Sequence, residues 1–291
     1  IPSASEELIL SFESGELAMA LSQVVFAAAQ DEGRPVLTGV LLQVQGKKVS
    51  LVATDGYRLS SKNLIVKEAK LERNLLIPAK TLLEVARMAQ EKSKEEGEVK
   101  VAFTPEKSQI VFLLPDVELS SRLLEGEFPD FGKIIPQNSS IRAEFDKEEF
   151  LRAIKVASIF AREQANIVKL KIENGRLIIS AETPQVGGNE SEVLAKTEGG
   201  ELEIAFNCRF LLDFLSSTPG EVIILEANGP LSPGVFKIKG EIKSFKQFGK
   251  EQNHLEVILA DGSRQVKAIS FFSLPTTYNL QPTNSSCTLH A

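Results

Sequence analysis

One pattern of secondary-structure elements occurs twice in this sequence, about 130 residues apart, and this repeat constrains the fold more than any other feature. Each copy begins with a segment that has apolar residues at helical spacing, and continues with two strands about a turn, at Gly46 or at Asn174-Gly175. A further strand and a second helix follow, entered at Pro78 or at Asn207. A repeat of this length indicates a duplicated α+β domain, because solenoid units span only roughly 20–50 residues. The apolar positions of the leading helices are Leu17, Leu21, Val24 and Val25 in the first copy, and Phe150, Leu151, Ile154 and Ile159 in the second.

The order of predicted elements divides the chain into three units. A polar stretch at residues 137–140, just after Pro136, separates the two copies. From Phe236 the sequence matches neither copy and alternates short β-rich pieces with glycine turns, as a small barrel would. We therefore predict one domain over residues 1–138, a second over residues 139–235, and a short all-β, barrel-like tail over residues 236–291.

Composition is typical of a folded protein in water. The 291 residues can bury more than one core, and no apolar run approaches the ~20 residues that a membrane helix needs. Cys208 and Cys287 lie far apart in segments of different composition, which favours a reducing cytoplasm over a disulfide framework. The chain opens with Ile and has no signal segment, so we expect that residues are missing upstream. A net charge of -6 argues against indiscriminate nucleic-acid binding but is compatible with a local basic face.

No residue pattern predicts catalysis or a bound metal. His254 and His290 lack Cys, Asp or Glu partners at metal-ligand spacing, and the glycine-rich phosphate loops and the nucleophile-elbow motif are absent from the sequence. We therefore predict a non-catalytic binding protein without a cofactor. The aspartates that could serve as acid–base groups each have a turn, loop or amphipathic context that accounts for them; these are Asp55, Asp116, Asp130 and Asp213.

Three stretches resemble the bacterial sliding clamp family, the beta subunits of DNA polymerase III: residues 34–64, residues 121–136 and FNCRFLLDFL at residues 206–215. The resemblance covers roughly residues 1–235 in the family's order. It implies duplicated α+β clamp domains, with helices on one face of antiparallel sheets. These two domains correspond to the middle domain and to most of the third domain of a clamp chain. In that family, two chains of three domains each form a ring around duplex DNA and tether the polymerase. The expected partners are therefore duplex DNA, DNA polymerase III, the clamp loader and further copies of the chain.

The resemblance also implies a cleft for short linear peptides around the turn that follows LVAT at residues 51–54. Apolar residues of the turn and linker would form its walls, Gly56 would let a peptide backbone approach, and Arg58 would meet polar or acidic groups at the rim. The alternative is that residues 54–56 are only a tight turn and that the leucines are core. The implied site comprises Arg34, Leu37, Thr54, Gly56, Tyr57, Arg58, Leu59, Pro129, Lys133, Ile134, Phe210 and Ser232.

Duplex DNA is expected to lie along the helices without base-specific contacts. A basic inner face on an acidic protein would attract phosphates weakly, which suits sliding. The alternative for each cation taken alone is an ordinary solvated side chain. The predicted DNA-contacting residues are Lys80, Arg87, Arg152, Lys155 and Arg209.

The sequence departs from the family at both ends. The resemblance leaves the family's first domain and the last strand of its third domain without counterparts. The tail resembles, more weakly, the oligonucleotide-binding barrel of RecJ-type single-strand exonucleases, although the catalytic Asp-His-His signature is absent. The alternative functions are therefore a single-strand DNA-binding accessory of such an exonuclease and a non-functional fusion of fragments. In the first of these alternatives, bases would stack on Phe245, Phe248, Phe271 and Phe272 beside Lys243, Lys246 and Lys250. Phenylalanines of a small barrel are more often core residues, and this structural interpretation is favoured for most of the four.

Overall fold

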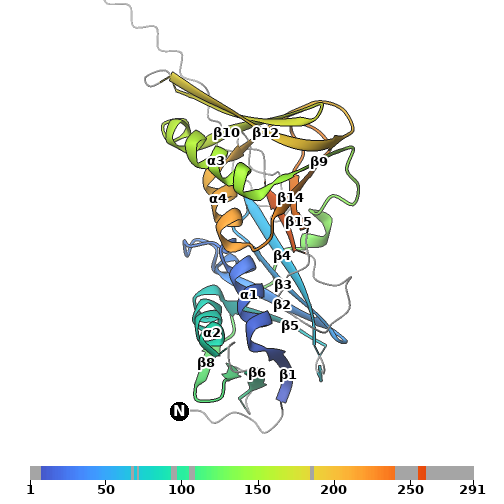
Figure 1. Cartoon of the computed structure of the whole chain (residues 1–291). Helices are drawn as coiled ribbons and strands as arrows, with labels where there is room; N and C mark the ends of the chain where they lie inside the picture. The colour runs from blue at the N-terminus through green and yellow to red at the C-terminus, as the bar shows by residue number, and fades with distance from the viewer. Residues whose placement is uncertain are drawn as a thin grey trace, which may run out of the picture.

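The computed structural model describes residues 8–66, 69–70, 72–92, 97–104, 109–183, 187–239 and 255–259, and it has the predicted α+β architecture (Figure 1). Most of the predicted barrel, including the phenylalanines and lysines expected to meet bases, lies outside these residues. None of the described helices is long and apolar enough to span a membrane.

The described residues of the first half form two α-helices, one 3-10 helix and eight strands. They are β1 (Leu8–Glu13), α1 (Ser14–Val25), the 3-10 helix η1 (Pro35–Thr38), β2 (Gly39–Gln45), β3 (Lys48–Thr54), β4 (Arg58–Ile65), β5 (Asn74–Pro78), α2 (Ala79–Lys92), β6 (Glu98–Phe103), β7 (Gln109–Leu113) and β8 (Glu118–Arg122).

The second half repeats the order, and its last strand β16 corresponds to β8 of the first half. Its elements are the 3-10 helix η3 (Phe131–Lys133), β9 (Ile141–Asp146), α3 (Lys147–Ala161), β10 (Ile167–Glu173), β11 (Arg176–Thr183), β12 (Gly187–Glu198), β13 (Leu202–Asn207), α4 (Cys208–Ser217), β14 (Val222–Ala227), β15 (Gly234–Lys239) and β16 (Leu255–Leu259).

The turn and capping signals of the sequence lie where they were predicted. Gly46 and Gly175 have φ angles of +56° and +83° between paired strands, a conformation that glycine adopts without steric cost. The Asn207 side chain caps α4 by accepting a hydrogen bond from the N–H of Arg209 at 2.9 Å. Because these signals are local, the repeat could be predicted from the sequence.

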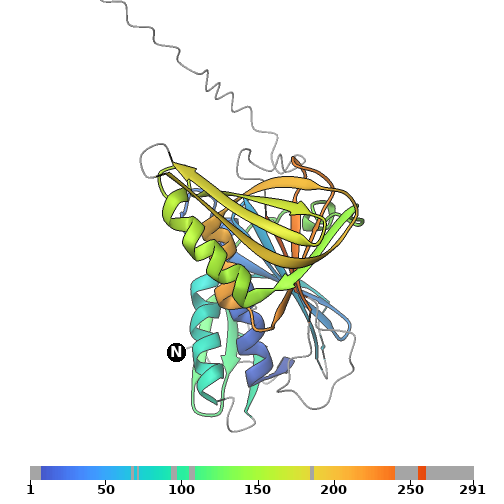
Figure 2. The ribbon, with the colours of Figure 1, turned by 45° about the horizontal axis from the view of Figure 1, so that its top comes forward.

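Antiparallel pairing joins the strands into two sheets. One has the order β1-β6-β7-β8, and the other has the order β13-β10-β11-β12-β9-β14-β15-β16-β4-β3-β2-β5. The four helices lie in a row on one side of the strands, with α2 against α1, α1 against α4, and α4 against α3 (Figures 1 and 2). The helices therefore form one layer that crosses the junction of the two halves.

Each half has its own apolar core between helices and sheets, and a smaller cluster lies at their junction. In this cluster Leu41, Val52 and Leu59 of the first half pack with Val235 of the second. Linker residues between the halves, including Phe131 and Ile134, pack against it. The linker therefore stabilises the junction through apolar contact.

One predicted core position is wrong. Ile154 is fully buried, but Ile159 is 63% exposed. It lies on the solvent-facing side of α3, the side that also carries exposed Arg152 and Lys155. The helix turns by about 100° per residue, so a position five residues after Ile154 leaves the buried stripe.

The predicted boundary at residue 235 falls inside β15. This strand pairs with β14 from Val235 to Lys239, and Phe236 is fully buried among Phe150, Phe206 and Phe214. Residues 236–239 therefore lie in the sheet of the second half. The strand β16 pairs with β15 as β8 pairs with β7 in the first half, so the prediction that the second half has no last strand is wrong.

The face of β4 that points toward the helices is polar. Ser60 donates a hydrogen bond from Oγ to the carbonyl oxygen of Gln23 in α1 at 2.6 Å. Lys62, two residues further along the same face, is 4% exposed. Burial lowers the pKa of Lys62 to about 8, against the opposing effect of the Glu16 carboxylate. Burial also raises the pKa of Glu16, so both charged forms are disfavoured here.

Replacing Phe236 by Ala should lower the free energy of unfolding of the second half by about 3–5 kcal/mol, because it leaves a cavity among three aromatic rings. Leu231→Ala is the matched control, since Leu231 is 65% exposed. Urea denaturation followed by circular dichroism measures both variants. Equal stability of the two variants would show that β15 is not part of this core.

Lys62→Met should stabilise the protein at pH 7 by roughly 1–2 kcal/mol, since it removes a buried ammonium group. Because the folded pKa of about 8 lies below the unfolded value of 10.5, the folded state binds fewer protons between these values. The penalty from Lys62 is therefore complete below pH 8 and decreases as the pH rises toward 10.5. Unfolding free energies at several pH values should show the advantage of the variant shrinking above pH 8. Exposed Lys48 is the control: Lys48→Met should give no such trend, and a constant gain for Lys62→Met would contradict the assignment.

Candidate peptide site and basic helix face

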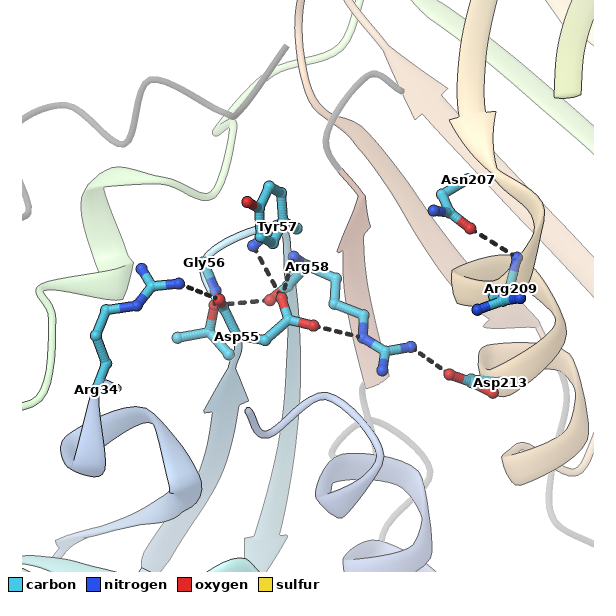
Figure 3. A network of polar contacts seen from close by, with 9 residues as sticks. Arg34, Asp55, Gly56, Tyr57, Arg58, Asn207, Arg209 and Asp213 are labelled. Carbon is cyan, nitrogen blue, oxygen red and sulfur yellow. Dashed lines mark hydrogen bonds and ion pairs between the residues drawn. The ribbon is translucent and has the colours of Figure 1, made fainter. Parts of the chain in front are cut away.

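The turn between β3 and β4 satisfies its own polar groups. Oδ1 of Asp55 accepts hydrogen bonds from the N–H groups of Tyr57 at 2.8 Å and Arg58 at 3.0 Å (Figure 3). Oγ1 of Thr54 donates to the carbonyl oxygen of Arg58 and accepts from the N–H of Gly56. Gly56 has a φ of +91°, which side-chain-bearing residues rarely adopt. The tight turn predicted as the alternative is therefore present, and Asp55 organises it.

Arg58 does not lie at the rim of a cleft, so this part of the sequence prediction is wrong. Its side chain is 8% exposed, and its Nε and Nη1 atoms contact Asp55 Oδ2 at 3.1 Å and Asp213 Oδ2 at 2.5 Å (Figure 3). The guanidinium also lies over the rings of Phe210 at 4.5 Å and Phe26 at 5.4 Å. Two carboxylates and two aromatic faces compensate the buried cation. Since α4 carries Phe210 and Asp213, Arg58 links the two halves of the chain.

The predicted approach of a peptide to Gly56 is occupied by Arg34. Nη2 of Arg34 donates to the carbonyl oxygen of Asp55 at 3.1 Å (Figure 3). A Cβ atom on Gly56 would lie only 2.9 Å from Arg34 Nη1. The small size of Gly56 therefore accommodates an arginine of the same chain, and a ligand must displace this side chain to reach the turn backbone.

The predicted apolar wall is only partly open to solvent. Leu37 and Leu59 are 4% and 2% exposed, as the core alternative predicted, whereas Pro129 and Ile134 are half-buried in the linker. Ile134 packs against the junction cluster that contains Leu59, so these residues of the predicted site do lie together.

The remaining members of the predicted site differ in exposure. Tyr57 and Lys133 are exposed, and Nζ of Lys133 contacts Asp130 at 2.9 Å, which raises the pKa of Lys133. Phe210 and Ser232 are half-buried. The N–H of Ser232 donates to the carbonyl oxygen of Gly229 at 3.2 Å.

Every predicted DNA-contacting residue lies on a helix and is exposed. Arg87 makes ion pairs with Glu84 and Glu91 of its own helix, and such exposed pairs are weak. Arg162, at the C-terminal end of α3, is a further exposed cation that the sequence reasoning missed. The predicted residues are Lys80 and Arg87 on α2, Arg152 and Lys155 on α3, and Arg209 on α4.

The part of the chain that the structure describes offers no group of three His, Cys, Asp or Glu side chains that could hold a metal. Cys208 is buried, and burial raises the pKa of its thiol, so it is a poor nucleophile.

The sequence reasoning missed the roles of Phe26, Asp55 and Asp213. The spacing of Asp55 and Arg58 across a hairpin turn is a local signal for a capped turn. Phe26 and Asp213 have no comparable signal, because they reach Arg58 only through the packing of α1 and α4.

Comparisons with known proteins match nearly the whole described chain. The family model of the DNA polymerase III beta subunit central domain matches residues 11–130, and that of its C-terminal domain matches residues 132–247. The beta sliding clamp of Staphylococcus aureus is 32% identical over 243 residues, which are 83% of this chain and 63% of the relative. The beta sliding clamp of Staphylococcus epidermidis is 30% identical over the same shares. This chain thus spans less than two thirds of the length of these relatives.

Solved structures give the same result. The DNA polymerase sliding clamp from Bacillus subtilis has a TM-score of 0.79 and 28% identity, covering 90% of this chain and 66% of that chain. A sliding clamp from Pseudomonas aeruginosa bound to griselimycin has a TM-score of 0.77 and 26% identity, covering 90% of this chain and 68% of that chain. The clamp resemblance is confirmed, and the clamp is favoured over the exonuclease accessory.

Arg58→Ala should lower the free energy of unfolding by about 3 kcal/mol, since it leaves Asp55 without its buried partner and removes contact with two rings. Arg87→Ala, which breaks only exposed ion pairs, should change it by less than about 0.5 kcal/mol. Urea denaturation of both variants makes the comparison. Equal losses would mean that Arg58 contributes no more than a surface arginine.

Proposed function

The chain belongs to the family of bacterial DNA polymerase III beta subunits, the sliding clamps, and from this premise we propose that it is a processivity factor that encircles duplex DNA and tethers DNA polymerase III. The observation that carries the proposal is the continuous row of four helices on one side of a sheet that joins both halves. Such a layer presents one continuous face to a long ligand.

DNA contact is proposed to run along the exposed cations of α2, α3 and α4. The five predicted cations are distributed over these three helices, and α1, which packs against α2 and α4, has no charged residue from Leu17 to Val25. Cations spread in this way contact phosphates without selecting bases. The overall charge of -6 repels the duplex elsewhere, which limits binding to this face.

The ring is proposed to form from several copies of the chain. The two family-matched domains of one chain would supply one third of a six-domain ring, so three copies would complete it. The expected location is the cytoplasm, and the expected role is non-catalytic.

Peptide partners, among them the polymerase and the clamp loader, are proposed to bind between the β3–β4 turn and the linker. Exposed Tyr57 and the half-buried side chains of Pro129 and Ile134 provide apolar contact, and Arg34 provides a cation that can move away from Gly56. The relative from Pseudomonas aeruginosa that was solved with griselimycin supplies a probe for this site.

Retention on circular DNA tests the clamp function. Light scattering should give the mass of a closed oligomer that stays on a circular duplex, with a clamp loader present, and leaves it when the circle is cut. Arg152→Glu combined with Lys155→Glu should weaken retention and reduce its salt dependence by up to about two phosphate contacts. Lys169→Glu combined with Lys196→Glu is the matched control, since both lysines are exposed and lie on strands β10 and β12 instead of on a helix. A monomer that ignores the circle would refute the proposal.

Tyr57→Ala and Ile134→Ala should each weaken griselimycin binding by about tenfold, because each removes apolar contact from the proposed site. Isothermal titration calorimetry measures the affinity, with Lys48→Ala at the far end of β3 as the control. Unchanged affinity in both variants, with their fold intact by circular dichroism, would place the ligand elsewhere.

A further inference from the structure

An exposed leucine on α2 lies between two cations of the same helix. Leu83 is 56% exposed, three residues after Lys80 and four residues before Arg87, and both cations are exposed as well. Residues three or four apart are neighbours on a helix surface, so the three side chains form one stripe. The two cations are seven residues apart, which corresponds to about 10.5 Å along the helix axis.

The same arrangement occurs on α3. Ile159 is 63% exposed, four residues after Lys155 and three residues before Arg162, and both of these cations are exposed. Arg162 is the C-cap residue and keeps helical backbone angles, with φ of −56° and ψ of −39°, so it extends the same helix surface. The two cations are again seven residues apart, and Val156, 42% exposed, lies one turn before Ile159.

Duplication of the domain does not account for this agreement. In the repeat α3 corresponds to α1, and α2 corresponds to α4, so the two stripes lie on helices of different position. The helices α2 and α3 are the two ends of the helix row (Figures 1 and 2). A single exposed aliphatic residue is ordinary on a protein surface, but here two of them share one frame of cations. The shared pattern points to one ligand that meets both ends of the row.

The sugar–phosphate backbone of duplex DNA offers the complementary surface. Its phosphates are anionic, and the deoxyribose rings between them present apolar C–H groups. Contacts to phosphate and sugar carry no sequence information, so such a surface is met at every position along the duplex. An anionic membrane is a poorer fit, since a helix that lies in a lipid interface has a wide apolar face instead of one aliphatic residue between charges.

We propose that Leu83 and Ile159 pack against deoxyribose rings of duplex DNA, between phosphates that the flanking cations bind. This inference rests on the proposed binding of duplex DNA and adds an apolar contact to the charged ones. An apolar contact releases no counterions, so its contribution to the affinity does not depend on salt.

The stripe on α3 is expected to contribute more than the stripe on α2. On α2, Arg87 contacts the carboxylates of Glu84 and Glu91, which compete with a phosphate for this cation. On α3, Glu163 lies beside Ile159, but its Oε2 accepts a hydrogen bond from Oγ1 of Thr183 in β11 at 3.2 Å. This bond directs the carboxylate toward the sheet.

Leu83→Ala combined with Ile159→Ala in the full chain should weaken binding of a short fluorescent duplex by roughly tenfold. The variant removes no charge, so the slope of log affinity against log salt concentration should stay as in the wild type. Lys155→Gln combined with Arg162→Gln should instead flatten this slope by up to about two phosphate contacts. Fluorescence anisotropy at several salt concentrations measures both effects, and circular dichroism confirms that the variants are folded.

Leu194→Ala combined with Leu231→Ala is the matched control. Both leucines are highly exposed, at 75% and 65%, and they lie on strand β12 and in a turn instead of on a helix. This variant should bind the duplex like the wild type. Equal weakening by the control and by the helix variant would overturn the proposal.

Inorganic polyphosphate separates the sugar contact from the charge, because it carries phosphates without deoxyribose. The Leu83→Ala, Ile159→Ala variant should bind polyphosphate within about twofold of the wild type. Equal losses on polyphosphate and on the duplex, or unchanged duplex binding, would overturn the sugar contact and leave the proposed clamp function standing. If the variant instead lost binding only to phosphatidylserine vesicles, the stripes would serve a membrane and the proposal would be wrong. A wild-type chain that bound no duplex would refute the proposed function and this inference with it.

Discussion

The burial of the Arg58 guanidinium at the junction is the interaction on which the relation of the two halves depends. A cation removed from water requires compensation, and here the compensation comes from both sides: Asp55 in the adjacent turn, Phe26 after α1, and Phe210 with Asp213 on α4. Separation of the halves would leave the cation without half of its partners. The same network stabilises the β3–β4 turn, so the proposed peptide site and the junction share one set of contacts.

The sequence could predict the features that depend on neighbouring residues. Helical periodicity, the turn glycines and the Asn207 cap act over a few residues, and they reproduced the order of elements in both halves. Burial depends on packing between distant segments. The sequence analysis therefore placed Arg58 at an exposed rim although it is buried, and Ile159 in the core although it is exposed. No local pattern in residues 255–259 indicated which strands they would join.

The candidate site was predictable only as a set of residues. The family resemblance predicted Arg34, Gly56, Leu59 and Ile134 as members of one site. In the structure Arg34 lies beside Gly56, and Ile134 packs against the cluster that contains Leu59. Their present arrangement is not a simple open cleft, because Arg34 covers Gly56 and Leu59 is core. Side-chain orientation follows from three-dimensional competition for space, which a motif does not encode.

The main-chain pairing of β16 has a consequence for how such a protein can change over generations. Backbone hydrogen bonds are the same for almost every amino acid, so a position held by them tolerates wide drift in sequence as long as the segment stays extended and avoids proline. A segment of different sequence can therefore take this position, provided that it stays extended between β4 and β15. The strand at the junction of the two halves is then a position of the sheet where the amino-acid sequence can change without loss of the backbone pairing.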